Sequence, residues 1–298
     1  MDIFKIIDND KSGMRELRIF NVRIASWLRS KNIVKAVQKQ QKMLNAICTN
    51  IDFEAKGVLR NIQLIQLNAL KVFDKFASEN GILYWIDFVT LLGARRYGKF
   101  IPWDDDIDLS VVRSDYVRLN ELSTNLPEDY ILEKSEDGRT FIFRDKRFPG
   151  CLKIDIFPVD LINKCLSIEE GEKITTKIKR KYDESKLKQS IKKINDLLIG
   201  ESIIYENNEH KAYGICYGVE FCHWKHSTIF RDKKDIFPLK RIKFEGGMYP
   251  CPNDVDKHLT LLYKDFEMPD FSIPCHSDVD KLALDEIVFI NKEVVKYK

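Results

Sequence analysis

The sequence predicts an α+β fold, because helical periodicity and short apolar strands are interspersed along its 298 residues. Apolar side chains recur at helical spacing from Leu59 to Asn80, and Asn80-Gly81 is typical of a helix end. The next stretch, 82–86, is short and aromatic, which is typical of a buried strand. Another apolar strand is predicted over 107–112, and helical and strand patterns continue beyond it.

The composition is that of a soluble protein that can bury a sizeable core, with 44% hydrophobic and 32% charged residues. A net charge of +3 is too small to predict nucleic-acid binding from overall electrostatics. The seven cysteines are odd in number, scattered and without CxxC pairs, which favours the reducing cytoplasm. No signal-peptide core or membrane-length apolar segment is present, so we expect a soluble or peripheral protein.

Residues 1–50 are predicted to form a basic, helical N-terminal extension, and residues 51–298 the main domain. Leu17, Ile24 and Leu28 recur at helical spacing among many arginines and lysines. Such a helix could contact an anionic membrane, or it could pack against its own domain or a second subunit.

Several further elements follow along the chain. Strands are predicted at 130–133, 141–144 and 153–157, the last ended by Pro158. Thr90 is predicted to cap a short helix whose first amides face an anion. Residues 167–198 are charged and helical, which favours a solvated helix pair on the surface.

Four carboxylates crowd into Asp104–Asp108, and two of them alternate with apolar residues. On a strand, Asp106 and Asp108 would lie on one face, about 6.6 Å apart along the backbone. Carboxylates this close raise each other's pKa unless a cation holds them deprotonated, and Mg²⁺ or Mn²⁺ suits oxygen ligands. A metal site is therefore predicted, and the alternative is a solvated acidic turn.

Asp155 repeats the same pattern, since it stands between two isoleucines on a predicted strand. If the two strands are neighbours in one sheet, Asp106, Asp108 and Asp155 can converge and bind one or two Mg²⁺ ions. Metals held this way bridge phosphate oxygens and align a hydroxyl for in-line attack, which favours phosphoryl or nucleotidyl transfer. The alternative for Asp155 is an acid that faces water from an edge strand.

These motifs resemble the LicD family, which is related to fukutin and placed in the nucleotidyltransferase superfamily. The resemblance rests on 90–94, Arg96, 100–108 and 154–158. It continues in the C-terminal segments Phe244-Glu245-Gly246, Tyr249-Pro250, Tyr263 and Pro269, so it covers about 59 to 270. Residues 1–50 lie outside it.

The resemblance implies a mixed sheet flanked by helices, as in nucleotidyltransferases. It also implies a metal-dependent transferase that moves a phosphorylated alcohol, phosphocholine above all, from a CDP-activated donor to a glycan hydroxyl. The acceptor would be a precursor of lipopolysaccharide, capsule or teichoic acid on the cytoplasmic side. Carried over by position, the catalytic and metal-binding residues would be Asp106, Asp108 and Asp155, one of which could also be the general base, and the donor phosphates would contact Thr90, Gly93 and Arg96.

Three positions depart from the family pattern. Val89 replaces a glycine before Thr90 and should restrict the approach of the backbone to a phosphate. Gly98-Lys99 inverts the commoner order of a basic residue and glycine, and Lys264 replaces a glycine.

Arg96 could pair with a phosphate, or instead with the acidic loop at Asp104 or Asp105.

Other functions remain open at this point. A glycerol- or ribitol-phosphate transferase, or a nucleotidyltransferase proper, would use the same acids. A catalytically silent nucleotide-binding or assembly subunit is the alternative from another class, and three clustered carboxylates argue against it because they are costly to keep.

Two further clusters of side chains each allow an ordinary structural interpretation and a functional one. Cys216, Cys222, His223 and His226 could bind zinc, but their spacing fits no standard finger and ordinary packing is favoured. A basic group leads into Asp155, where a phosphate contact, a counter-charge for the acids or a solvated face would each explain it, the solvated face being favoured. That group consists of Arg144, Lys146, Arg147 and Lys153.

Overall fold

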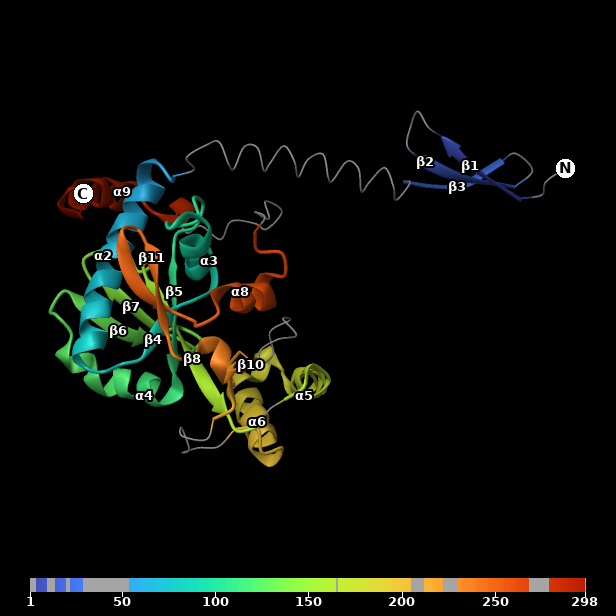
Figure 1. The fold of residues 1–298 in the computed structure, drawn as a ribbon. Helices are drawn as coiled ribbons and strands as arrows, with labels where there is room; N and C mark the ends of the chain where they lie inside the picture. The colour runs from blue at the N-terminus through green and yellow to red at the C-terminus, as the bar shows by residue number, and fades with distance from the viewer. Residues whose placement is uncertain are drawn as a thin grey trace. The chain divides into compact units, whose positions relative to one another are not determined.

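The structure is a computed structural model that describes residues 4–9, 14–19, 22–28, 54–164, 166–204, 212–221, 230–267 and 279–297. The chain divides into two compact units, Met1–Phe53 and Glu54–Lys298. In the first unit, three strands form an antiparallel sheet in the order β1-β2-β3 (Figure 1). These strands are β1 (Phe4–Asn9), β2 (Met14–Ile19) and β3 (Val22–Leu28).

The helical prediction for residues 1–50 is wrong where the structure describes that segment. Residues 4–28 contain strands, and residues 29–53 lie outside the described part of the chain. In Val22–Leu28 the β-branched Val22 and Ile24 alternate with Arg23, a pattern that also fits a strand. Pairing with a neighbouring strand satisfies the backbone amides, so the tertiary context decides the outcome.

The second unit is built on a seven-stranded mixed sheet with the order β10-β9-β8-β5-β4, and β7 and β6 branch from β8 (Figure 1). Its β5–β8 pair is parallel and its other pairs are antiparallel. The strands are β4 (Tyr84–Ile86), β5 (Ile107–Val112), β6 (Tyr130–Lys134), β7 (Phe141–Asp145), β8 (Ile154–Ile162), β9 (Gly214–Tyr217) and β10 (Phe230–Asp232). A separate hairpin consists of β11 (Lys240–Phe244) and β12 (Gly247–Cys251).

Helices flank this sheet, so the α+β prediction is confirmed. They are α2 (Gly57–Glu79), α3 (Phe88–Tyr97), α4 (Arg113–Leu122), α5 (Ile168–Lys181), α6 (Leu187–Gly200), α7 (Lys233–Ile236), α8 (Val255–Tyr263) and α9 (Leu284–Glu293). Short 3-10 turns occur at Ser123–Asn125, Glu184–Lys186, Val279–Lys281 and Val294–Tyr297. Among the described helices, none is long and apolar enough to cross a bilayer.

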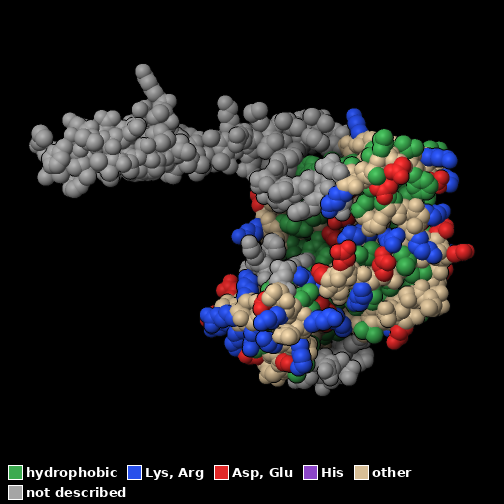
Figure 2. Space-filling view, turned by 180° about the vertical axis from the view of Figure 1, so that it is seen from behind, with side chains coloured by type: hydrophobic (Ala, Val, Ile, Leu, Met, Phe, Trp, Pro, Cys, Tyr) green, Lys and Arg blue, Asp and Glu red, His purple; other side chains and the backbone are tan. Residues whose placement is uncertain are grey.

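The predicted surface pair over 167–198 is confirmed as α5 and α6. Exposed cations crowd the last turn of α5, at Lys179, Arg180 and Lys181. Figure 2 shows Lys and Arg side chains gathered over this part of the molecule, at the lower left of the view.

The two faces of the sheet differ in chemistry. Ile107 and Leu109 of β5 are fully buried in the main core, together with Phe73 of α2. Because side chains alternate along a strand, Asp108 and Ser110 project from the opposite face. The sheet therefore carries its acids on the face turned away from the main core.

Strand β8 continues through Pro158 to Ile162, so the predicted end at Pro158 is wrong. One edge of β8 pairs with β7 up to Ile156 and with β9 from Val159 onward. The Pro158 carbonyl accepts from Gly218 N on that edge, at 2.8 Å. Pro158 thus falls where the partner strand changes, and its missing N–H removes no ladder hydrogen bond.

Candidate active site

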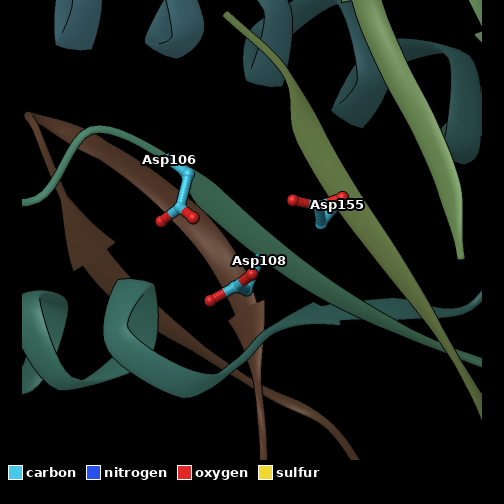
Figure 3. A group of neighbouring side chains, drawn as sticks. All are labelled: Asp106, Asp108 and Asp155. Atoms are coloured by element: carbon cyan, nitrogen blue, oxygen red, sulfur yellow. The ribbon is translucent and has the colours of Figure 1, made fainter. Parts of the chain in front are cut away.

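The three predicted acids converge at the start of two neighbouring strands. Asp106 immediately precedes β5, Asp108 lies on β5, and Asp155 lies opposite Asp108 on β8 (Figure 3). One carboxylate oxygen of each residue lies within 4.8 Å of the others. The parallel β5–β8 pairing brings together residues that are 47 positions apart, which confirms the predicted convergence.

Burial makes the charge on these acids costly. It raises the pKa of Asp106 to about 6, with Asp155 and Asp105 adding repulsion. It also raises the pKa of Asp108 well above its ordinary range, with further repulsion from Asp106 and Asp155. Hard oxygen donors crowded in this way match the ligands of Mg²⁺ or Mn²⁺, so the residues present fit a divalent ion.

Asp104 joins this group, which the sequence reasoning did not foresee. Its side chain hydrogen-bonds with that of Asp106, and burial with repulsion from Asp106 raises its pKa. Its Oδ2 atom is buried without a hydrogen-bond partner. Crowding within the run, rather than alternation, was the signal that could have identified it.

Lys153 provides a positive charge at the triad. Its Nζ lies 2.7 Å from Oδ2 and 3.1 Å from Oδ1 of Asp155. Burial opposes this charge, but Asp155 and then Asp106 raise the pKa of the ammonium above its ordinary value. The sequence left a phosphate contact, a counter-charge for the acids or a solvated face open for the basic group before Asp155. In this structure, Lys153 acts as a counter-charge.

The arginines of that basic group have other partners. Arg144 pairs with Glu133 across β6 and β7, and Arg147 pairs with Asp145. Lys146 is exposed, as the favoured solvated face predicts. The group therefore does not act as one surface.

Thr90 is hydrogen-bonded to the backbone of Asp108. Its side chain is 1% exposed, and its Oγ1 accepts from Asp108 N at 2.9 Å. The predicted cap role is wrong, because α3 begins at Phe88 and Asp87 caps it. A threonine at position 90 supplies a hydroxyl that accepts a hydrogen bond from β5, the strand that carries Asp108.

Gly93 permits close packing of α3 against the segment that follows it. A Cβ at this position would lie 2.6 Å from Lys99 O and 2.9 Å from Ile101 N. Arg96, also on α3, donates from Nε to the backbone carbonyl of Phe266, and burial lowers its pKa. These contacts give both residues a structural role, and their contact with donor phosphates stays a prediction.

A buried polar network surrounds Asp87, which the sequence reasoning missed. His258 Nε2 lies 2.7 Å from Asp87 Oδ1, and Ser110 Oγ donates to Oδ2 at 2.7 Å. Trp85 Nε1 and the Tyr217 hydroxyl also donate to Oδ2. Burial favours the protonated form, but His258 and Ser110 hold the pKa of Asp87 below its ordinary value.

This network is joined to the triad through the backbone. Asp87 N donates to Asp108 O at 3.0 Å, so α3 and β5 are held together at the acid. Tyr263, at the end of α8, lies close enough for Asp108 and Asp87 to raise its pKa, in addition to the effect of burial. The C-terminal α8 therefore contributes to the same region.

Two buried glutamines of α2 hold the acidic loop from the other side. Gln66 Nε2 donates to Asp105 O at 2.6 Å and to Lys153 O at 3.3 Å. Gln63 Nε2 donates to Asp104 O at 2.8 Å. A polar residue at a core position of an amphipathic helix was the sequence signal for both.

The structure does not test the alternative of a zinc site at Cys216, Cys222, His223 and His226, because it describes one of these four residues. Cys216 is buried in β9. Cys222, His223 and His226 lie outside the described residues.

The sequence of this chain is similar to proteins of a known family. Residues 81–195 match the sequence model described as LicD/FKTN/FKRP, nucleotidyltransferase domain. The lipopolysaccharide cholinephosphotransferase LicD of Haemophilus influenzae is 26% identical over 71% of this chain and 92% of that protein. These similarities support membership of the LicD family.

Other relatives of this chain are similar over shorter stretches. Human ribitol 5-phosphate transferase FKRP is 34% identical over 26% of this chain and 17% of that protein. Mannosyltransferase regulator 4 of Saccharomyces cerevisiae is 35% identical over 27% of this chain and 7% of that protein. The matched LicD domain contains all three acids of the triad, whereas Gln66 and His258 lie outside it.

Proposed function

We propose that this LicD-family chain is a metal-dependent transferase that moves phosphocholine from CDP-choline to a hydroxyl of a cell-surface glycan. The observation that carries the proposal is the triad of Asp106, Asp108 and Asp155 inside the matched domain. The relative that is matched over most of its length is named a lipopolysaccharide cholinephosphotransferase. A precursor of lipopolysaccharide or of a similar glycan is therefore the first acceptor to test.

In this reaction, the acceptor oxygen attacks the phosphorus of the phosphocholine group. The bond from that phosphorus to the bridging oxygen breaks, and CMP leaves with the electron pair. A divalent ion, when bound by Asp106, Asp108 and Asp155, would offset the charge on the donor phosphates. One carboxylate of this acidic group would take the proton of the hydroxyl, since His258 is 1% exposed and bonded to Asp87.

A ribitol- or glycerol-phosphate transferase is the second candidate. The similarity to a ribitol 5-phosphate transferase supports it, because the matched stretch belongs to the same family. The same acids would serve that reaction, so only the donor distinguishes the two. The similarity to a mannosyltransferase regulator keeps a silent assembly subunit as the third candidate.

A donor panel tests these candidates directly. CDP-choline, CDP-glycerol and CDP-ribitol are each incubated with Mg²⁺ or Mn²⁺ and a lipopolysaccharide acceptor, and CMP release is measured. We expect release with CDP-choline, and release with CDP-ribitol alone would favour the second candidate. If none of the donors releases CMP or raises the melting temperature, the transferase proposal fails.

Substitution of the acids tests the triad itself. We expect Asp106→Asn and Asp155→Asn to lower turnover by at least about 100-fold, because each removes a negative ligand. Asp285→Asn, which changes an exposed acid of α9, is the matched control and should retain turnover. Full turnover in either triad variant would show that the assignment is wrong.

A further inference from the structure

Lys153 lies where a divalent ion would have to compete for Asp155. Its ammonium contacts both oxygens of that carboxylate, at 2.7 and 3.1 Å, and the Lys153 side chain remains 29% exposed. A Mg²⁺ ion would need an Asp155 oxygen at about 2.0–2.1 Å. If the ammonium stayed in place, it and the ion would lie within about 5 Å of each other and repel.

The position of Lys153 also allows it to move. Lys153 directly precedes β8, and its backbone carbonyl accepts a hydrogen bond from Gln66. Both features fix the position of its backbone. Its side chain is long and flexible, and its charged end is partly open to solvent. Lys153 can therefore leave Asp155 without any change in the sheet.

Charge balance indicates where the ammonium would go. Three ionised carboxylates are offset by one divalent ion and one ammonium. A CDP-activated donor then adds negative charge at the same place, and a lysine ammonium is a common partner of phosphate oxygens. Arg144 and Arg147 are already paired with Glu133 and Asp145.

We propose that Lys153 is a donor-binding residue that exchanges partners: it neutralises Asp155 before metal binding, and it contacts a donor phosphate once the ion is bound. This inference rests on the proposed function, because it requires a divalent ion and a nucleoside-diphosphate donor at the triad. It gives Lys153 two opposite effects, opposing the metal and favouring the donor.

The test measures the two affinities separately. Mn²⁺ alone is titrated by calorimetry into the full chain and into Lys153→Met, and CDP is then titrated at saturating Mn²⁺. We expect Lys153→Met to bind Mn²⁺ about tenfold more tightly and CDP about tenfold more weakly, because removing one charge acts oppositely on a cation and an anion. Lys153→Arg should stay near wild type for CDP, and Lys146→Met, which removes an exposed lysine, should match wild type in both.

The outcomes separate this inference from the proposed function. If wild type does not bind Mn²⁺, the metal part of the proposed function is wrong. If wild type binds Mn²⁺ but Lys153→Met binds it equally or more weakly, or binds CDP equally well, the exchange of partners is wrong. A purely structural lysine would lower both affinities together.

A measurement on wild type covers the case in which the variant does not fold. The reaction of Lys153 with an amine-specific reagent is followed by mass spectrometry. Mn²⁺ should speed the labelling by releasing the ammonium from Asp155, and CDP added afterwards should slow it. A labelling rate of Lys153 that changes with neither Mn²⁺ nor CDP would contradict the proposal.

Discussion

At the scale of single residues, the site depends on groups that hold the acids as much as on the acids. Asp108 is fixed on three sides, by its strand, by the Thr90 hydroxyl and by the amide of Asp87. Its crowding with Asp106 and Asp155 raises the free energy of the metal-free protein and leaves the site prepared for a cation.

The hydrogen bond from Asp108 to Thr90 yields a stability prediction. Thr90→Val keeps the shape but leaves the buried Asp108 N–H without an acceptor, which should cost about 1–3 kcal/mol of unfolding free energy. Urea denaturation measures this change. Thr176→Val, on the exposed side of α5, is the control and should change stability by about 0.5 kcal/mol at most. Equal stability of Thr90→Val and wild type would contradict the role given to Thr90.

The raised pKa of Asp106 predicts how metal binding depends on pH. The folded pKa of about 6 lies above the ordinary 3.8, so the folded state holds this proton more tightly than the unfolded state does. In the absence of metal, the stabilisation from Asp106 is complete below about pH 3.8. It is lost as the pH rises through about 6.

Protons should therefore compete with the ion. We expect Mn²⁺ affinity to be at least about tenfold lower at pH 5 than at pH 7, since most of Asp106 would be protonated at pH 5. Calorimetric titration at both values measures this. An affinity independent of pH would contradict the assignment of Asp106 as a ligand.

At the scale of elements, the site is a junction of β5 and β8 that is held between two helices. Helix α3 packs closely on one side through Gly93, and α2 donates from Gln66 on the other. Gln63 and Gln66 of α2 donate to the carbonyls of Asp104 and Asp105, so this helix holds the loop that leads to Asp106.

Gly93 gives a prediction about the α3 side. Gly93→Ala places a Cβ 2.6 Å from Lys99 O, so the helix must shift, and we expect a loss of about 1–3 kcal/mol in unfolding free energy. Gly200→Ala at the end of α6 meets no neighbour within 4 Å and should leave stability unchanged or slightly higher. Thermal denaturation compares the two variants. A stable Gly93→Ala would show that this close approach is not required.

Gln66 gives the matching prediction on the α2 side. Gln66→Leu removes the donor to the carbonyls of Asp105 and Lys153, which should cost about 1–3 kcal/mol and lower Mn²⁺ affinity. Gln189→Leu, on the exposed face of α6, is the control for the change in residue type. Unfolding and metal titration are measured on both. An unchanged Mn²⁺ affinity in Gln66→Leu would contradict its role in positioning the acids.

At the scale of the whole molecule, the site belongs to one unit. The triad, Lys153, Gln66 and the Asp87 network all lie within Glu54–Lys298, which has its own hydrophobic core. The sheet formed by β1, β2 and β3 belongs to the other unit.

This separation predicts that the chain shortened to 54–298 folds and binds Mn²⁺ within about twofold of the full chain. Saturating Mn²⁺ should raise the melting temperature of both proteins by about 5–10 °C, the increase expected at an ion concentration about 100 times the dissociation constant. Calorimetry and thermal denaturation compare them. Loss of metal binding in the shortened chain would show that residues 1–53 contribute to the site.

Local patterns predicted much of this protein because the side chains themselves carry the signal. The periodicity of α2 and the alternation in β5 depend on neighbours in sequence, and both elements occur where they were expected. The pattern at 4–28 was compatible with a helix or a strand, and pairing between strands decided it. Pro158 was expected to end a strand, and only the change of partner along β8 explains why it does not.

The candidate site divides in the same way. Alternation of Asp106, Asp108 and Asp155 with apolar residues was sufficient to predict which acids share a face. The β5–β8 register, the Asp104 contact, the Gln66 bridge and the Lys153 pair join residues that are distant in sequence or that local spacing does not distinguish. Sequence spacing fixes the face of a strand, whereas the distance between two strands is set by packing, so the tertiary structure decided which charges meet.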